Sequence, residues 1–241
     1  MNDTESDIMS VIEGAIQQHP RSQQKRIGPS EIGIECDKRI LNKLAGVEEP
    51  PRPAAWKPAI GTAVHAQLEE WFNTAVEVSG HYRWVTEQRV NCGAIGDQPL
   101  TGSCDLYDDW TGTVVDWKII GPKQLANYRA QGPSQQYRVQ AHTYGLGFAR
   151  NQDGWSMPKT VAIMFLPRDG ELGKAYFWSE PWQPTIALDA INRVNKLDQL
   201  WRIVGIQKAV EMSPGCTSPW CPWCKADLAA ASRREGASLF D

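Results

Sequence analysis

The chain has 241 residues, of which 41% are hydrophobic and 22% are charged, and this suits one globular domain with at most a small appendage. No uncharged apolar stretch of about 18 residues is present, and the acidic first seven residues do not resemble a secretory signal. We therefore expect a cytoplasmic protein without a membrane span. The net charge of −3 indicates no general attraction to nucleic acid. Basic residues near the N-terminus could still form a local path for DNA, or simply a solvated face. They are Arg21, Lys25, Arg26, Lys38, Arg39 and Lys43.

The spacing of hydrophobic residues predicts helices and strands along the whole chain. A short helix is expected first, and a second helix is capped by Ser30, contains Cys36 and ends near Leu44. A loop rich in proline follows at 46–58. The expected helices are 8–16, 30–44, 59–78, 122–130, 134–150 and 184–210. The expected strands are 82–90, 100–107, 113–120, 159–167 and 173–179.

This order of elements predicts an α/β domain with a mixed central β-sheet flanked by helices. Residues 1–28 form a separate flexible or helical segment in this interpretation. Residues 29–241 form a single domain, which includes a cysteine-rich end at 212–225.

Two aspartates face each other in the hairpin predicted for residues 100–120. A turn centred near Trp110 places Asp105 directly opposite Asp116, with their Cβ atoms about 5 Å apart. Carboxylates this close repel each other unless a cation lies between them, and Mg²⁺ or Mn²⁺ prefers such oxygen ligands. Lys118 shares the strand face with Asp116. A simple salt bridge on a solvated strand is the alternative interpretation.

Two further pairs of residues recur at helical spacing. His65 lies four residues after Gly61, and Tyr144 lies four residues after Gln140. Each pair alone is ordinary, because such residues are common on helix surfaces and in cores. The two pairs become informative through their order in the sequence, with one before the hairpin and one after it.

The ordered set resembles the RecB-type branch of the PD-(D/E)xK nucleases, which have a restriction-endonuclease-like fold. It consists of Gly61…His65, Gly102…Asp105, Asp116-Trp117-Lys118 and Gln140…Tyr144. The resemblance implies that the side chains of His65, Asp105 and Asp116, with the backbone carbonyl of Trp117, bind catalytic Mg²⁺ or Mn²⁺.

The resemblance also assigns roles around the metal. Lys118 would orient the attacking water or stabilise charge on the phosphate. Gln140 and Tyr144 would position the lysine or the DNA backbone, and Glu87 matches a recurrent acid of the family. Hydrolysis of a phosphodiester needs an activated water and a cation near the anionic transition state, and a divalent ion supplies both.

Four of the six cysteines form a second pattern, with one near the N-terminus and three near the C-terminus. They are Cys36, Cys216, Cys221 and Cys224. The pattern resembles the iron–sulfur site of AddB-type nucleases and of the CRISPR-adaptation exonucleases, the fourth Cas protein. That resemblance implies a [4Fe–4S] cluster joining the helical segments near the chain ends.

The cysteine spacing departs from those families, because the longer gap precedes the shorter one. A zinc ion on the same four thiolates is therefore an alternative, as are free thiols. Trp220, Pro222 and Trp223 would shield a metal from water, or else simply pack. Cys92 and Cys104 are expected to be small buried hydrophobic residues.

We therefore expect a metal-dependent DNA exonuclease that acts on single-stranded or frayed ends. The resemblance implies a role in recombination, repair or phage DNA processing in the cytoplasm, which would be the host cytoplasm for a phage-encoded protein. The sequence has no phosphate-binding loop for ATP, so a helicase or recombination partner would supply unwinding. The alternatives are a non-catalytic DNA-binding adaptor with a structural iron–sulfur or zinc site, and a redox sensor.

Overall fold

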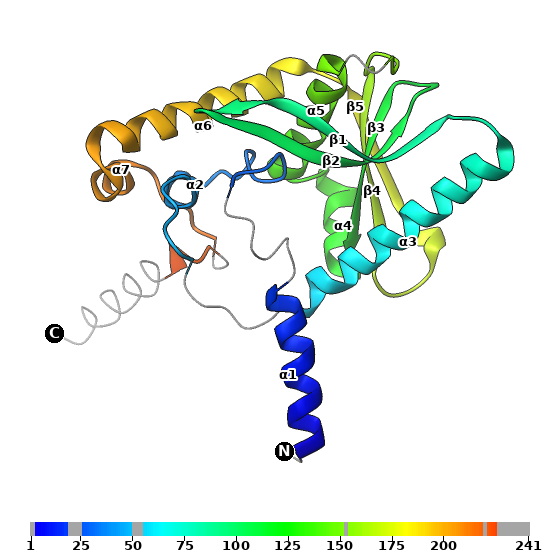
Figure 1. Cartoon of the computed structure of the whole chain (residues 1–241), viewed down its shortest axis with the longest axis horizontal. Helices are drawn as coiled ribbons and strands as arrows, with labels where there is room; N and C mark the ends of the chain where they lie inside the picture. Colours follow the sequence, from blue (N-terminus) through cyan, green and yellow to red (C-terminus); the bar gives the residue numbers. More distant parts are fainter. Residues whose placement is uncertain (1–2, 19–25, 50–54, 152–153, 219–220, 226–241) are drawn as a thin grey trace.

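A computed structural model describes residues 3–18, 26–49, 55–151, 154–218 and 221–225 (Figure 1). The predicted mixed sheet flanked by helices is confirmed. The described strands are β1 (Trp84–Ile95), β2 (Gln98–Asp108), β3 (Thr113–Ile120), β4 (Thr160–Pro167) and β5 (Tyr176–Pro181). The described helices are α1 (Asp3–Gln18), α2 (Asp37–Leu44), α3 (Trp56–Ser79), α4 (Pro122–Gln131), α5 (Gln135–Arg150), α6 (Pro184–Val204) and α7 (Ile206–Met212), with a 3₁₀ turn at Leu172–Lys174.

The five strands lie side by side in chain order, and only the β3–β4 pair is parallel. Helices α4 and α5 form the crossover that this parallel pair requires. Strands β2 and β3 pair only at Leu106–Val115, Tyr107–Val114 and Asp108–Thr113. This is the register predicted from the sequence, and Asp105 and Asp116 come directly after its last pair.

Strands β1 and β2 continue together as a long hairpin that reaches α6 (Figure 1). Asn195 of α6 holds the tip of this hairpin. Its side chain accepts a hydrogen bond from the Gly96 amide at 2.7 Å and donates one to the Ala94 carbonyl at 3.1 Å. The β1–β2 hairpin therefore leaves β3 at the level of the two aspartates.

Each face of the sheet packs on different helices. On one face Tyr107 stacks on Phe148 of α5 with ring centroids 4.0 Å apart, in a core that also includes α6. On the other face, Leu106 and Val115 pack against α3 through Leu68 and Phe72. Burial of these apolar side chains stabilises the layers and fixes the position of α3 and α5 against the sheet.

The predicted helix at 30–44 is wrong in its first half. Residues 29–33 form turns, and α2 begins only at Asp37, after Cys36. Gly33 explains the difference, because a Cβ atom there would lie 2.8 Å from the Val139 Cβ of α5. The segment follows the surface of α5 closely, and long-range packing overrides local helix propensity.

Two other predicted boundaries also shift. The helix expected at 184–210 breaks at Gly205, whose φ of +82° ends α6 and starts α7. Helix α3 begins at Trp56, so Pro58 lies in its first turn rather than in a loop, a position that proline tolerates. Arg21, Lys25 and Trp220 lie outside the described residues. None of the helices described here is long and apolar enough to cross a membrane.

Candidate active site

Three side chains that can bind a metal converge where β2 leaves β3. His65 of α3, Glu87 of β1 and Asp105 of β2 each place one ligand atom within 4.8 Å of the other two. His65 Nδ1 lies 3.3 Å from Asp105 Oδ1. The second oxygen of Asp105 accepts a hydrogen bond from the Trp117 amide at 2.7 Å, which ties β2 to β3 at this point.

Glu87 has a backbone conformation that is rare outside glycine. Among the described residues it is the single non-glycine residue with a positive φ, +45°. Its strand pairs at Thr86–Leu106 and Gln88–Cys104, so Glu87 lies at the level of Asp105. Strain of this kind persists where surrounding packing imposes it, often at functional sites. The sequence indicated Glu87 only through the family resemblance.

Asp116 and Lys118 of β3 form an ion pair that is withdrawn from water. The Lys118 ammonium contacts Asp116 Oδ2, and the Asp116 side chain is almost fully buried. The salt bridge of the alternative interpretation is thus present, but it is buried and not on a solvated face. Asp116 Oδ1 is buried without a hydrogen-bond partner among the residues described here. A buried acceptor left unpaired costs about 1–3 kcal/mol, so a cation at this oxygen would stabilise the site.

Burial shifts the pKa values of this pair. It raises the pKa of Asp116 to about 6, with the nearby Asp105 carboxylate adding to the rise and Lys118 opposing it. Burial alone would lower the pKa of Lys118, but the charges of Asp116 and Asp105 outweigh it and leave that pKa above its ordinary value. Lys118 is thus a cation at neutral pH.

Helix α5 holds the lysine from the other side. Lys118 Nζ donates to Gln140 Oε1 at 3.2 Å and lies 4.7 Å above the centre of the Tyr137 ring. Tyr144 is buried beside Gln140, and its burial, together with the nearby aspartates, raises its pKa well above the usual range. Tyr137 was not among the site residues predicted from the sequence, although it lies three residues before Gln140 and therefore on the same helix face.

A groove of about 1670 Å³ opens onto these residues. Basic side chains line it: Arg26, Arg39, Lys43, Lys57, Arg89 and Arg168. One wall of the groove is the segment that contains Pro29. This proline packs closely on Gly102, since a Cβ atom added to Gly102 would lie 2.9 Å from Cγ of Pro29. The glycine of the Gly102…Asp105 motif therefore permits this wall to approach β2.

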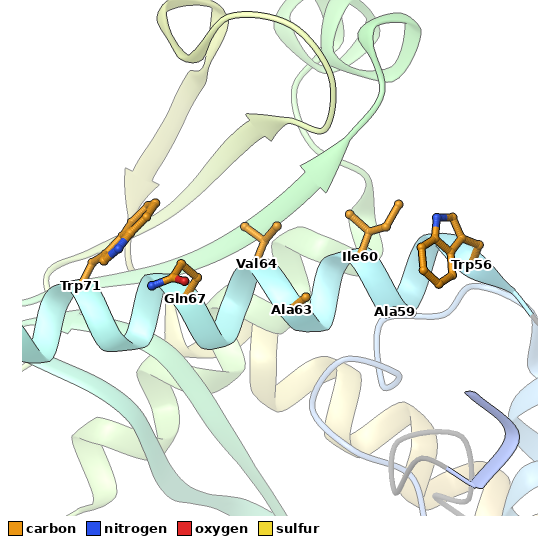
Figure 2. Close-up of a pocket in the computed structure, with 7 residues that line it drawn as sticks. All are labelled: Trp56, Ala59, Ile60, Ala63, Val64, Gln67 and Trp71. Atoms are coloured by element: carbon orange, nitrogen blue, oxygen red, sulfur yellow. The ribbon is translucent and has the colours of Figure 1, made fainter. Parts of the chain in front are cut away.

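Helix α3 also carries an apolar pocket of about 380 Å³, which adjoins the groove at Trp56, Ala59 and Ala63. Figure 2 shows Trp56, Ile60, Val64 and Trp71 projecting from the same side of this helix. Both tryptophans are exposed, Trp56 to 60% and Trp71 to 62%. Trp56 also lines the basic groove, whereas Trp71 does not.

The predicted convergence of the four cysteines is confirmed. Cys36 Sγ lies 3.6 Å from Cys224 Sγ and 3.8 Å from Cys221 Sγ. The thiol of Cys216 completes a group in which all four sulfurs lie within 4.8 Å of one another. Burial raises the pKa of the Cys221 thiol, but hydrogen bonds from the Cys224 and Trp223 amides and from the neighbouring thiols together outweigh it and leave that pKa below its ordinary value.

The two remaining cysteines lie in the core, as expected. Cys92 and Cys104 are fully buried. Burial raises the pKa of Cys92 to about 12 and that of Cys104 well above its ordinary value. Neither belongs to the group of four.

No protein-family model matches the sequence, and no curated protein matches it either. Among solved structures, the fold is similar to an alkaline exonuclease from Laribacter hongkongensis, at 9% identity over 88% of this chain and 97% of that one, with a TM-score of 0.49. The same exonuclease in complex with dAMP matches at 13% identity over 78% and 90%, with a TM-score of 0.47. The protein SSO0001 matches at 14% identity over 82% and 86%, with a TM-score of 0.48. Sequence identities this low indicate a similar fold and carry no information about activity.

Proposed function

We propose that this chain is a metal-dependent deoxyribonuclease that hydrolyses phosphodiester bonds at DNA ends. One observation carries the proposal: the buried Asp116–Lys118 pair lies at a basic groove beside the ligand group of His65, Glu87 and Asp105. Hard oxygen ligands, one imidazole and a fixed cation are the side chains that hydrolysis of a phosphodiester requires.

The residues present fit Mg²⁺ or Mn²⁺. Asp105 and Asp116 would supply carboxylate oxygens, and Oδ1 of Asp116, which has no hydrogen-bond partner within the described parts of the chain, is a ready ligand atom. His65, Glu87 and the backbone carbonyl of Trp117 are the further candidates. When bound, a divalent ion activates water and neutralises charge on the phosphate.

Lys118 acts as a cation in this proposal, not as a base. Its raised pKa keeps it protonated at neutral pH. Asp116, Gln140 and the ring of Tyr137 fix the position of its ammonium group. A charge held in place can stabilise the negative charge that develops on the phosphate without reorganising. Tyr144 supports this arrangement through Gln140.

The substrate we propose is DNA with unpaired ends. Lysines and arginines along the groove suit the phosphate backbone, and the exposed indole of Trp56 at the groove offers a surface on which an unpaired base can stack. The family resemblance extends the proposal to recombination, repair or phage DNA processing, with a separate helicase supplying unwinding.

The test is degradation of end-labelled single-stranded DNA with Mn²⁺ or Mg²⁺, compared with EDTA and with a closed circular strand. We expect linear DNA to be degraded, the circle to persist, and EDTA to stop the reaction. Asp116→Ala and Lys118→Ala should each lower the rate by at least about 10²-fold. Asp198→Asn is the matched control, because Asp198 is a buried aspartate of α6 outside the groove.

One outcome favours the non-catalytic adaptor. A folded wild-type chain that binds DNA but cleaves none with any divalent metal would overturn the nuclease proposal. Circular dichroism of every variant separates loss of chemistry from loss of fold.

A further inference from the structure

The four-cysteine group has a geometry that distinguishes between the two metal sites that the sequence left open. We infer that Cys36, Cys216, Cys221 and Cys224 hold a single tetrahedral zinc ion, in place of the iron–sulfur cluster that the family resemblance implies. The inference depends only on these residues and their surroundings. It stands or falls independently of the proposed nuclease activity.

The sulfur–sulfur distances match one central ion. Four thiolates around a zinc ion, each at about 2.3 Å, form a tetrahedron with edges of about 3.8 Å. The distances from Cys36 Sγ to Cys224 Sγ and Cys221 Sγ are 3.6 Å and 3.8 Å, and all four sulfurs lie within 4.8 Å of one another.

An iron–sulfur cluster needs a wider arrangement. In a four-iron cluster, each cysteine binds a different iron atom, so the thiolates surround the entire cluster. The space enclosed by sulfurs less than 4.8 Å apart accommodates one ion and not four irons with their sulfides. The [4Fe–4S] expectation therefore does not fit the described geometry.

The surroundings are those of a closed, structural site. Cys36, Cys221 and Cys224 are each no more than 4% exposed. The Cys216 amide donates a hydrogen bond to Cys224 Sγ at 3.4 Å, which orients that sulfur within the group. Four protein ligands without an open position are typical of structural rather than catalytic zinc.

The site joins two distant parts of the chain. Cys36 directly precedes α2, and the other three ligands follow α7. The segment from Arg26 to Lys43 also forms a wall of the groove. Arg193 of α6 provides a second attachment, with hydrogen bonds of 2.9 Å to the Ile34 carbonyl and 3.0 Å to Asp37. Zinc should therefore stabilise this wall of the groove.

The experiment is metal analysis of the full chain, purified in parallel with and without oxygen from cells supplied with both iron and zinc. The oxygen-free preparation matters, because zinc could replace a cluster that oxygen had destroyed. We expect about one zinc ion per chain in both preparations, with neither iron nor acid-labile sulfide. Four irons with sulfide and a brown colour in the oxygen-free protein would overturn the inference, as would a chain with no metal and freely reactive thiols.

A second measurement uses Co²⁺ as a spectroscopic probe. Replacing zinc by Co²⁺ should give the visible bands of a tetrahedral ion and an intense thiolate-to-metal band in the near ultraviolet. Cys224→Ala should lose the zinc and lower the melting temperature, while Cys92→Ala, a buried cysteine outside the group, should keep it. If Cys224→Ala does not fold, titrating the wild type with a mercurial reagent decides, because zinc release should track the modification of four thiols.

Discussion

The buried Asp116–Lys118 pair makes a strong prediction about stability in the absence of metal. Lys118→Met removes the cation and leaves the Asp116 carboxylate buried near that of Asp105. Removing one partner of a buried ion pair lowers the free energy of unfolding by about 3–5 kcal/mol. The solvent-accessible pair of Arg39 and Glu49 is the control, and Arg39→Met should cost about 1 kcal/mol or less.

Mn²⁺ should change the stability of the Lys118→Met and Asp116→Ala variants differently. In Lys118→Met the ion neutralises the remaining carboxylates, so its addition should recover much of the lost stability. In Asp116→Ala a ligand is missing, so Mn²⁺ should restore little. For the wild type, an ion at a hundred times its Kd adds about 2.7 kcal/mol to the free energy of unfolding.

The assay is urea unfolding followed by circular dichroism, in EDTA and at several Mn²⁺ concentrations. Equal stabilisation of both variants by Mn²⁺ would refute the role of Asp116 as a metal ligand. A cost below about 1 kcal/mol for Lys118→Met in EDTA would contradict the burial of the pair.

Two further predictions address the groove and the core. Trp56→Ala should weaken binding of single-stranded DNA by about 1–3 kcal/mol, measured by fluorescence anisotropy, because a stacking surface is lost. Trp71→Ala, on the same helix but outside the groove, should leave binding unchanged, and equal losses would reject the stacking role. The second prediction concerns His142, whose Nδ1 accepts from the Gln183 amide at 3.2 Å while Nε2 lies 2.6 Å from Glu180. Burial lowers its pKa despite the carboxylate, so the unfolded chain binds more protons. His142 should therefore add to the pH dependence of stability a downward slope below about pH 6.5, opposite in sign to the contribution of the raised Asp116 pKa. In melting curves from pH 7.5 to 5.5, His142→Gln should flatten that slope, and an unchanged slope would contradict the assignment.

Much of the site is encoded in local sequence. The turn between β2 and β3 fixes their register, so the level of Asp105 and Asp116 follows from the spacing of residues around Gly112. Strand alternation places Lys118 beside Asp116. Both inferences hold because they depend on neighbours within about a dozen residues.

Other parts of the site exist only in the folded chain. Glu87 joins the ligand group through a strained backbone, and Tyr137 reaches Lys118 from a different helix. Neither contact follows from hydrophobic periodicity, because periodicity describes one element at a time and these contacts join several.

The four-cysteine group also depends partly on local sequence and partly on the folded chain. The sequence determined that Cys216, Cys221 and Cys224 lie close together, since the short gaps leave little alternative. Cys36 was expected to join them only through the family resemblance, and it does so in the tertiary structure, where packing against α5 replaces the expected helix at 30–36 with turns. The distances between the four sulfurs are likewise set by that packing. Residue spacing therefore determined which ligands are available, while the folded structure decided how far apart their sulfurs lie, which is the observation behind the zinc proposal.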